Sequence, residues 1–318
     1  MHKTIRSFSW VALAAFLLAA PVQAAPLFFD NFDNSFPSEP GFPGSVWPIW
    51  PIATDHMNAS QNHNHTPGGT TSIKLDPEYH ATLANYHDFG AAAVTVSATA
   101  WLFEDNNQIG SSTYPITVSI GLYGDSASGP TANTDYLLLG LNPGYADYNT
   151  YGYKSLTGGI GNTSVTRSNA IAGSVDGSRW IKLTIQAGSL ATGGHVGFYI
   201  NDVLVGTAAR QPGVSLRYFF MGTPGIPPQT ANYEFFWFDD VSITAIPEIT
   251  DITVSSGTVT INFISAASDQ ASNFTLVSSP TVNGVYSSAA GASITGSGGS
   301  YQATVTTSDP VQFYRIQR

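Results

Sequence analysis

The stretch from Tyr233 to Ile243, YEFFWFDDVSI, constrains the fold more than any other part of the chain. Four large apolar residues run directly into Asp239 and Asp240, after which Val241 and Ile243 resume a spacing of two. A short apolar run without helical spacing is typical of a strand buried on both faces. Adjacent carboxylates at its end need solvent, a hydrogen-bond partner or a cation. So late a strand is expected to pair with a much earlier one and to close a large β-domain.

The first 24 residues are expected to be an export signal. Lys3 and Arg6 form a basic head, residues 8–20 form an apolar core, and small residues at Val22 and Ala24 form a cleavage site. The core is shorter than the ~20 residues of a membrane-spanning helix, so we expect cleavage rather than anchoring. The sequence therefore predicts a secreted, extracellular or cell-surface protein with no membrane span after signal removal.

The composition excludes several classes of function. There is no cysteine, which removes disulfides, thiolate nucleophiles and thiolate metal sites. Lys and Arg total 11 against 21 Asp and Glu, giving a formal net charge of −10, so the surface repels nucleic acid and anionic lipid. Only 10% of residues are charged. A surface whose polarity comes from neutral side chains suits an extracellular polysaccharide or glycan as partner.

Alternating apolar residues predict an all-β chain with two antiparallel sandwiches. Residues 27–245 contain about eleven expected strands, among them 27–32, 92–103, 116–123, 136–141, 179–186 and 214–221. Residues 196–207 predict a hairpin around a two-residue turn at Asn201 and Asp202. A change in amino-acid composition after Ile246 predicts a second, smaller β-sandwich. The expected units are residues 1–24, 25–246 and 247–318.

Several of these spans resemble a known fold family. RWIKLTIQ (179–186), HVGFYINDVLVGT (195–207), FWFDDVSI (236–243) and LFFDNF (27–32) resemble strands of the concanavalin A-like lectin/glucanase jelly roll in its laminin-G-like form. The segments FTLVSSPTVNGVYSS and VQFYRIQR resemble small immunoglobulin- or fibronectin-like modules of secreted bacterial proteins. The resemblance implies a jelly-roll domain that binds or cleaves carbohydrate.

The acidic signature of the family's glucanases, Glu-x-Asp-x-x-Glu, does not occur in this sequence. Retaining hydrolysis needs two carboxyl groups about 5 Å apart. Glu234 is the strongest single acid, at the start of the closing strand. A histidine–tyrosine pair for β-elimination is a further alternative, with His80 or His87 beside Tyr79 or Tyr86. Glu234 and His87 remain weak catalytic candidates, and a structural role is the favoured interpretation of both.

Two clusters offer metal ligands. His56, His63, His65, His80 and His87 fall close together, and His63 with His65 can present two imidazoles to one ion, although a polar surface loop is the favoured interpretation. Asp30 and Asp33 follow the opening strand, and Asp239 and Asp240 lie on the closing strand. If those strands pair, the four carboxylates predict a structural calcium site. Capping and solvation are the alternative for them.

Aromatic residues in expected loops are the candidate ligand platform. Sugar rings stack on aromatic faces, and neighbouring polar side chains bind their hydroxyls. The candidate ligand-binding residues are Trp47, Trp50, Tyr145, Asp147, Tyr148, Asn149, Tyr151 and Tyr153. The alternative is that these aromatics pack over the sandwich edge, and packing is favoured for Trp101, Trp180 and Trp237 on strands.

The sequence thus predicts a secreted, non-catalytic carbohydrate-binding or adhesive protein. A polysaccharide-degrading hydrolase or lyase on the same fold is the alternative, and a structural surface or matrix protein is the third hypothesis. A convergent pair of acids would separate the enzyme from the binding protein.

Overall fold

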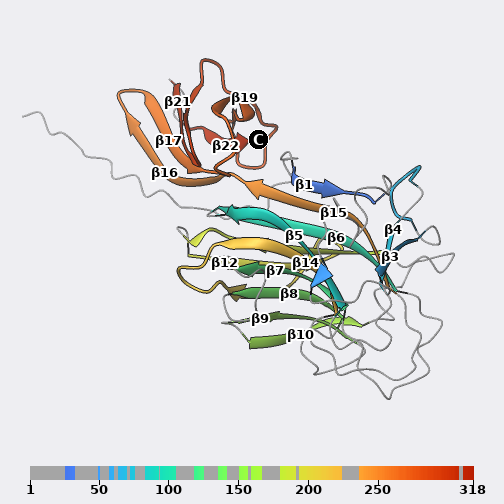
Figure 1. Ribbon diagram of the computed structural model, residues 1–318. Coiled ribbons are helices and arrows are strands. Elements are labelled where there is room, and N and C mark those ends of the chain that lie inside the picture. Colours follow the sequence, from blue (N-terminus) through green and yellow to red (C-terminus); the bar gives the residue numbers. More distant parts are fainter. Residues whose placement is uncertain are drawn as a thin grey trace, which may run out of the picture.

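The computed structural model describes most strands of two β-sandwiches (Figure 1). The described residues are 26–32, 49–50, 57–60, 64–69, 72–75, 83–92, 94–104, 118–124, 135–141, 150–156, 159–166, 180–190, 193–223, 236–307 and 311–318. The expected signal lies outside them. No helix among the described residues is long and apolar enough to cross a membrane.

The larger sandwich consists of two antiparallel sheets, which we name sheet A and sheet B. Sheet A has the order β13-β12-β11-β6-β15-β4-β3, and β1 also pairs with β15. Its strands are β13 (Val203–Ala209), β12 (His195–Ile200), β11 (Trp180–Ala187), β6 (Thr95–Glu104), β15 (Phe236–Ile246), β4 (Ser72–Leu75), β3 (Met57–Ser60) and β1 (Pro26–Asp30).

Sheet B lies against the inner face of sheet A and has the order β10-β9-β8-β7-β14-β5-β2. Its strands are β10 (Gly159–Thr166), β9 (Thr150–Ser155), β8 (Tyr136–Leu141), β7 (Val118–Gly124), β14 (Leu216–Thr223), β5 (Leu83–Ala92) and β2 (Ile49–Trp50).

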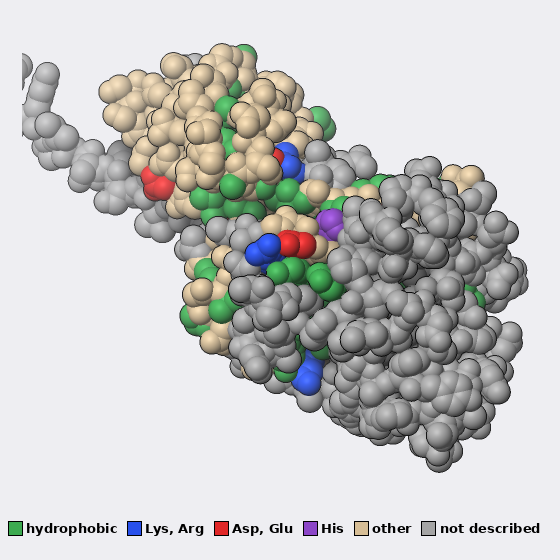
Figure 2. Space-filling model, in the orientation of Figure 1, with side chains coloured by type: hydrophobic (Ala, Val, Ile, Leu, Met, Phe, Trp, Pro, Cys, Tyr) green, Lys and Arg blue, Asp and Glu red, His purple; other side chains and the backbone are tan. Residues whose placement is uncertain are grey.

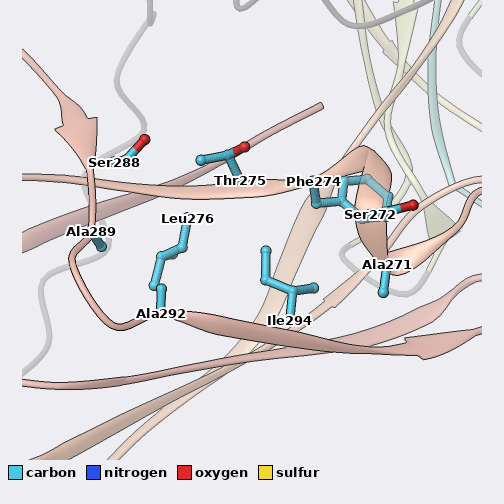
Figure 3. Close-up of a pocket in the computed structure, with 9 residues that line it drawn as sticks. All are labelled: Ala271, Ser272, Phe274, Thr275, Leu276, Ser288, Ala289, Ala292 and Ile294. Atoms are coloured by element: carbon cyan, nitrogen blue, oxygen red, sulfur yellow. The ribbon is translucent and has the colours of Figure 1, made fainter.

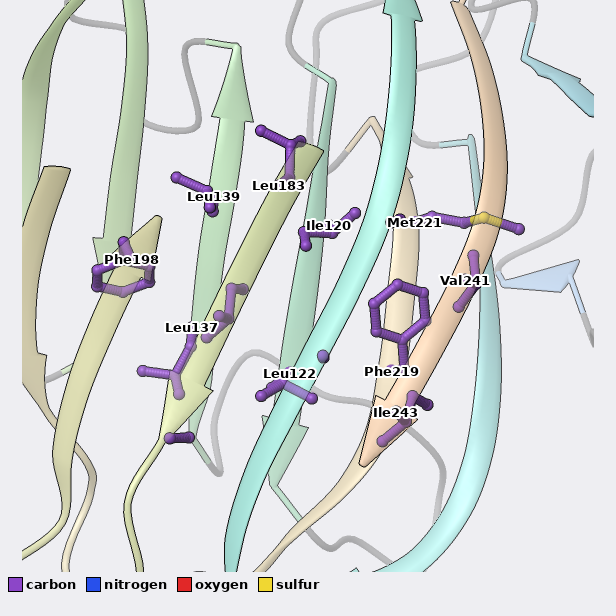
Figure 4. Packing of buried hydrophobic residues seen from close by; sticks show 14 of the residues in the cluster. Ile120, Leu122, Leu137, Leu139, Leu183, Phe198, Phe219, Met221, Val241 and Ile243 are labelled. Atoms are coloured by element: carbon purple, nitrogen blue, oxygen red, sulfur yellow. The ribbon is translucent and has the colours of Figure 1, made fainter. Parts of the chain in front are cut away.

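The main core fills the space between these two sheets. Every second residue of β11 and β6 is fully buried, and these side chains meet Leu137, Leu139, Phe219 and Met221 of sheet B (Figure 4). The intervening residues of β11 are only partly buried. Sheet A therefore keeps one apolar face for the core and presents the other, which we call its outer face, away from sheet B.

The strand expectations that fixed the architecture are confirmed. β15 lies inside sheet A between β6 and β1, and its Trp237 and Phe238 are buried. The opening strand β1 pairs with it, with Phe28 opposite Ile243. Asn201 and Asp202 form the predicted hairpin turn with φ of 49° and 65°. Tyr151 and Tyr153, which were expected in a loop, lie on a strand, since β9 and the start of β10 occupy part of residues 142–161.

The strands between Glu248 and Gln317 form the two sheets of a smaller sandwich. A four-stranded sheet has the order β16-β17-β21-β20, and a three-stranded sheet has the order β19-β18-β22. The elements are β16 (Glu248–Ser255), β17 (Thr258–Ile264), η3 (Ala271–Asn273), β18 (Thr275–Ser279), β19 (Ser287–Ser288), β20 (Ser293–Ser297), β21 (Ser300–Thr306) and β22 (Phe313–Gln317). The predicted all-β fold with a large and a small antiparallel sandwich is confirmed.

The small sandwich has its own core and touches the large one. Phe263, Phe274 and Tyr301 pack ring against ring at its centre. Ala266 joins the core of the large sandwich, and the Thr95 hydroxyl donates a 2.7 Å hydrogen bond to Glu248 Oε2. Side-chain contacts therefore connect the two sandwiches at the joint.

Candidate functional site

Asp239 and Asp240 lie at a β-bulge in β15. Asp239 pairs with Trp101 of β6 and Ser242 pairs with Thr99, so β15 uses one residue more than β6 between these points. Asp240 takes up the extra residue with a φ of 47°, a region that Asp tolerates better than most residues. Alternation already places Asp239 on the outer face, and with the bulge Asp240 also meets the 64–69 segment there.

The 64–69 segment is tied to this bulge by five hydrogen bonds. The backbone amides of His65 and Thr66 donate to Asp239 Oδ2 at 2.7 and 3.3 Å. The Thr66 hydroxyl donates to Asp240 Oδ1 at 2.6 Å and to Asp239 Oδ1 at 3.5 Å. His65 Nδ1 lies 2.6 Å from Asp240 Oδ2. The partner that the sequence required for these carboxylates is therefore a distant segment of the same chain.

His65 also sits on the aromatic part of the outer face. Its ring stacks on Trp101 with centroids 3.8 Å apart and meets the edge of Trp180 at 5.5 Å. Phe103 links Trp180 to Trp237 through edge contacts of 5.4 and 5.5 Å. These rings form an aromatic cluster at one end of the outer face.

Burial raises the pKa of Asp239 to about 6, against the lowering effect of the amides of His65, Asp240 and Thr66. A carboxyl with a raised pKa beside a second carboxyl is an arrangement that acid–base catalysis uses. Here Asp239 is fully buried and its oxygens accept hydrogen bonds from the 64–69 segment. In this structure the pair ties the 64–69 segment to β15, and we call this contact the tie.

The predicted calcium ligands do not all come together: Asp239 and Asp240 meet His65 at the bulge, whereas Asp30 lies on β1. The Asp30 carboxylate accepts a hydrogen bond of 2.8 Å from the Phe32 amide, and Asp33 lies outside the described residues. No group of three or more His, Asp or Glu side chains is arranged to hold a metal ion within the described ranges. Of the histidine cluster, only His65 and His87 are described. Structural calcium remains a prediction, which a fall in melting temperature on chelation would support.

The structure does not bring His87 and Tyr86 together, as the β-elimination alternative would require. These neighbours lie on opposite faces of β5, because successive side chains of a strand alternate. The His87 ring stacks on Phe28 at 3.6 Å, whereas Tyr86 meets the edge of Tyr218 at 5.7 Å on the outer face of sheet B. Glu234 and the other predicted pair, Tyr79 and His80, lie outside the described residues.

The predicted loop aromatics do not form one platform in the described part of the chain. Tyr151 lies on β9 and is fully buried. The prediction that it contacts a ligand is therefore wrong, because its ring belongs to the core. Tyr153 stacks on Phe198 at 4.8 Å. Trp50 belongs to β2. The residues outside the described ranges are Trp47, Tyr145, Asp147, Tyr148 and Asn149.

The outer face of sheet A carries a different constellation, which the sequence analysis missed. Thr99 and Thr184 face each other across β6 and β11 with their hydroxyl oxygens 2.9 Å apart. Tyr199 stands opposite Thr184 on β12, and its hydroxyl donates to Gln186 Oε1 at 3.3 Å. These partly exposed groups are uncharged donors and acceptors beside an aromatic ring.

The Tyr199 ring lies over Gly197. A methyl group at residue 197 would come within 2.7 Å of Tyr199 Cε2 and 2.9 Å of its hydroxyl oxygen. Glycine thus lets the ring lie down on the sheet instead of standing away from it. The sequence carried a signal for this arrangement: Gly197 stands two residues before Tyr199, on the polar face of an alternating strand.

Two cavities of the described structure have another character. A cavity of about 460 Å³ opens in the small sandwich, and its nine lining residues are small, aliphatic or aromatic, with none titratable (Figure 3). A second cavity of about 390 Å³ lies where the sandwiches meet, lined by Leu27, Phe89, Val94 and residues of the small sandwich. Neither brings together the polar and aromatic groups found on the outer face of sheet A.

No protein-family model matches the chain, and no curated protein matches it. Solved structures with partial similarity include a sialidase at 12% identity and a TM-score of 0.44, over 70% of this chain and 18% of that one. A structure of botulinum neurotoxin type C, described as interacting with two ganglioside molecules, has 12% identity and a TM-score of 0.39 over 84% and 76%.

The CBM22-2 xylan-binding domain of Paenibacillus barcinonensis Xyn10C has 15% identity and a TM-score of 0.35, over 69% of this chain and 98% of that one. The chain spans less than a fifth of the sialidase. At these TM-scores the similarities assign neither a family nor a ligand to this chain.

Proposed function

We propose that the chain is a secreted, non-catalytic carbohydrate-binding or adhesive protein that holds an extracellular glycan on the outer face of sheet A. The observation that supports this most directly is the Tyr199 ring lying over Gly197, bordered by Thr184 and Gln186. An aromatic ring lying along a surface offers its face to the apolar side of a sugar. Hydroxyl and amide side chains beside it bind the sugar's own hydroxyl groups.

The electrostatics of the chain suit a carbohydrate better than a polyanion. The formal net charge is −10, which opposes binding to nucleic acid. The described surface in Figure 2 shows few charged side chains among many neutral ones. On the outer face of sheet A, Lys182 already pairs with Asp202 at 2.8 Å.

Binding to an array of neutral and acidic glycans tests the proposal, with Tyr199→Ala as the decisive variant. Loss of the ring face should weaken binding at least about tenfold, equivalent to about 1.4 kcal/mol. The matched control is Thr253→Ala on the exposed strand β16 of the small sandwich, which should bind as the wild type does. Wild-type binding that Tyr199→Ala leaves unchanged would place the glycan elsewhere.

The Asp239–Asp240 pair motivates one alternative, a polysaccharide-degrading enzyme. That function requires the 64–69 segment to leave the carboxylates, since they are bonded to it. Release of reducing or unsaturated sugar, abolished by Asp239→Asn, would establish the enzyme and overturn the non-catalytic proposal. If neither binding nor turnover is found, a structural surface or matrix protein is the remaining hypothesis.

A further inference from the structure

An exposed aromatic residue on β1 extends the constellation around Tyr199. Phe29 stands opposite Ser242 of β15, while its neighbour Phe28 packs against the core. The Phe29 side chain is 53% exposed, which is unusual for a large apolar residue within a sheet. β1 lies beside β15 in Figure 1. Phe29 therefore shares the outer face with Tyr199, at the other side of sheet A.

The residues between these two rings form one continuous row across five strands, which we call the cross-strand row. Pairing places Ser242 opposite Thr99, Thr99 opposite Thr184, and Thr184 opposite Tyr199. The row is therefore Phe29, Ser242, Thr99, Thr184 and Tyr199. Neighbouring strands are about 4.8 Å apart, so its two ends are separated by about 19 Å.

The interior of the cross-strand row has spare hydrogen-bonding capacity. Each Ser or Thr hydroxyl has one donor and two acceptor positions. The bond between Thr99 and Thr184 uses one donor and one acceptor and leaves the other positions of that pair available. Hydroxyls at regular spacing between two rings match a ligand that repeats its own hydroxyl groups along its length.

The next row on the same face is also uncharged. Thr244, Ser97, Gln186 and Gly197 follow each other on β15, β6, β11 and β12. The nearest charged groups on this face are already paired: Lys182 with Asp202, and Asp240 with His65. His195 lies at the start of β12, two positions beyond Gly197 on the same face. A uronate or sulfate on the row would thus lose hydration, and Lys182, the nearest described lysine on this face, already pairs with Asp202.

We propose that the cross-strand row binds an extended, neutral polysaccharide chain that runs across the strands from Phe29 to Tyr199. The inference rests on the proposed function, because it specifies the ligand of the same face. A single sugar cannot reach both rings, whereas an extended chain of about four residues covers the strand spacings between them. The predicted ligand is therefore an internal stretch of a polymer rather than a chain end or an acidic glycan.

Isothermal titration with oligosaccharides of one to six residues tests the proposal. The neutral probes are xylo-, cello-, chito-, malto-, manno- and laminari-oligosaccharides, and the acidic probes are oligogalacturonates and oligoalginates. For at least one neutral series, affinity should rise by about tenfold or more between two and four or five residues and then level off. The acidic series should not bind.

The variant that isolates the row is Phe29→Ala. It should lower the affinity for a neutral hexasaccharide about tenfold and leave the affinity for the disaccharide unchanged, so the gain with chain length disappears. Because Phe29 is exposed, the melting temperature of the variant should equal that of the wild type. Val254→Ala, another exposed apolar residue on the edge strand β16, is the matched control and should bind as the wild type does.

A second variant tests the centre of the row without touching the aromatics. Thr184→Val keeps the shape of the side chain and removes the hydroxyl, and it should weaken hexasaccharide binding while the sheet stays folded. Affinity independent of chain length, acidic probes that bind more tightly, or a Phe29→Ala hexasaccharide affinity equal to wild type would each overturn the proposal. Those results would leave the proposed function intact as long as glycan binding still depends on Tyr199. An absence of binding to every probe would overturn the proposed function as well.

Discussion

The buried carboxyl of Asp239 should make the large sandwich more stable at pH 5 than at pH 7, relative to a variant that lacks it. The folded state holds the pKa of this group at about 6, above its ordinary value of 3.8, chiefly because the side chain is buried. The folded protein therefore binds this proton more tightly than the unfolded chain does. The resulting stabilisation is present in full below pH 3.8 and is lost as the pH rises through 6.

The magnitude follows from the size of the shift. A difference of about two pH units at about 1.4 kcal/mol per unit gives roughly 3 kcal/mol as an upper limit between the ends of the titration. Between pH 7 and pH 5, the expected change in the free energy of unfolding due to this carboxyl is about 1 kcal/mol. Other groups of the protein titrate in the same range. The quantity to compare is therefore the change in unfolding free energy with pH in wild type and in Asp239→Asn.

Urea unfolding followed by tryptophan fluorescence measures this difference. All six tryptophans precede residue 247, and Trp101 and Trp237 lie beside the tie, so the signal reports on the large sandwich. Wild type should gain about 1 kcal/mol between pH 7 and pH 5 relative to Asp239→Asn. Asp88→Asn is the control, since hydrogen bonding to Arg217 lowers the pKa of Asp88 below this window. Equal pH slopes for wild type and Asp239→Asn, or a loss of wild-type stability on going to pH 5, would refute the reasoning.

Two further predictions follow from packing. Gly197→Ala should weaken glycan binding about as much as Tyr199→Ala does, because the added methyl lifts the Tyr199 ring off the sheet, and titration beside a thermal melt that shows little change checks this. Binding as tight as wild type would contradict it. Phe238→Ala should lower the free energy of unfolding by about 3–5 kcal/mol in urea titrations, since the side chain is fully buried in the main core. A loss below about 1 kcal/mol would show that β15 is not central to the sandwich.

The features that sequence reasoning found are those carried by local patterns. Alternation with a period of two identified β11 and β12, and two adjacent residues that tolerate positive φ identified the turn at Asn201 and Asp202. β9 was missed because Tyr151 and Tyr153 sit among glycines and polar residues, a context that favours loops. Their spacing of two was the only strand signal.

The features that sequence reasoning could not find depend on register between distant strands. The tie between His65 and Asp240 joins residues 175 positions apart, and no local pattern specifies which carboxylate meets which amide. The cross-strand row depends on four separate pairings, and a slip of one residue in any of them turns its members toward the core. Composition indicated a neutral, hydroxyl-rich surface but not the alignment of those hydroxyls.

The bulge at Asp239 and Asp240 connects the tie to the proposed binding row. Before the bulge, even-numbered Phe238 points into the core and Trp237 points outward; after it, odd-numbered Val241 and Ile243 point inward. The extra residue thereby turns Ser242 to the outer face, opposite Thr99 and Phe29. A regular strand would instead bury Ser242 and break the row in the middle. The carboxylates that first suggested chemistry therefore hold the backbone irregularity that makes the row continuous, and the 64–69 segment stabilises that irregularity by bonding to both of them.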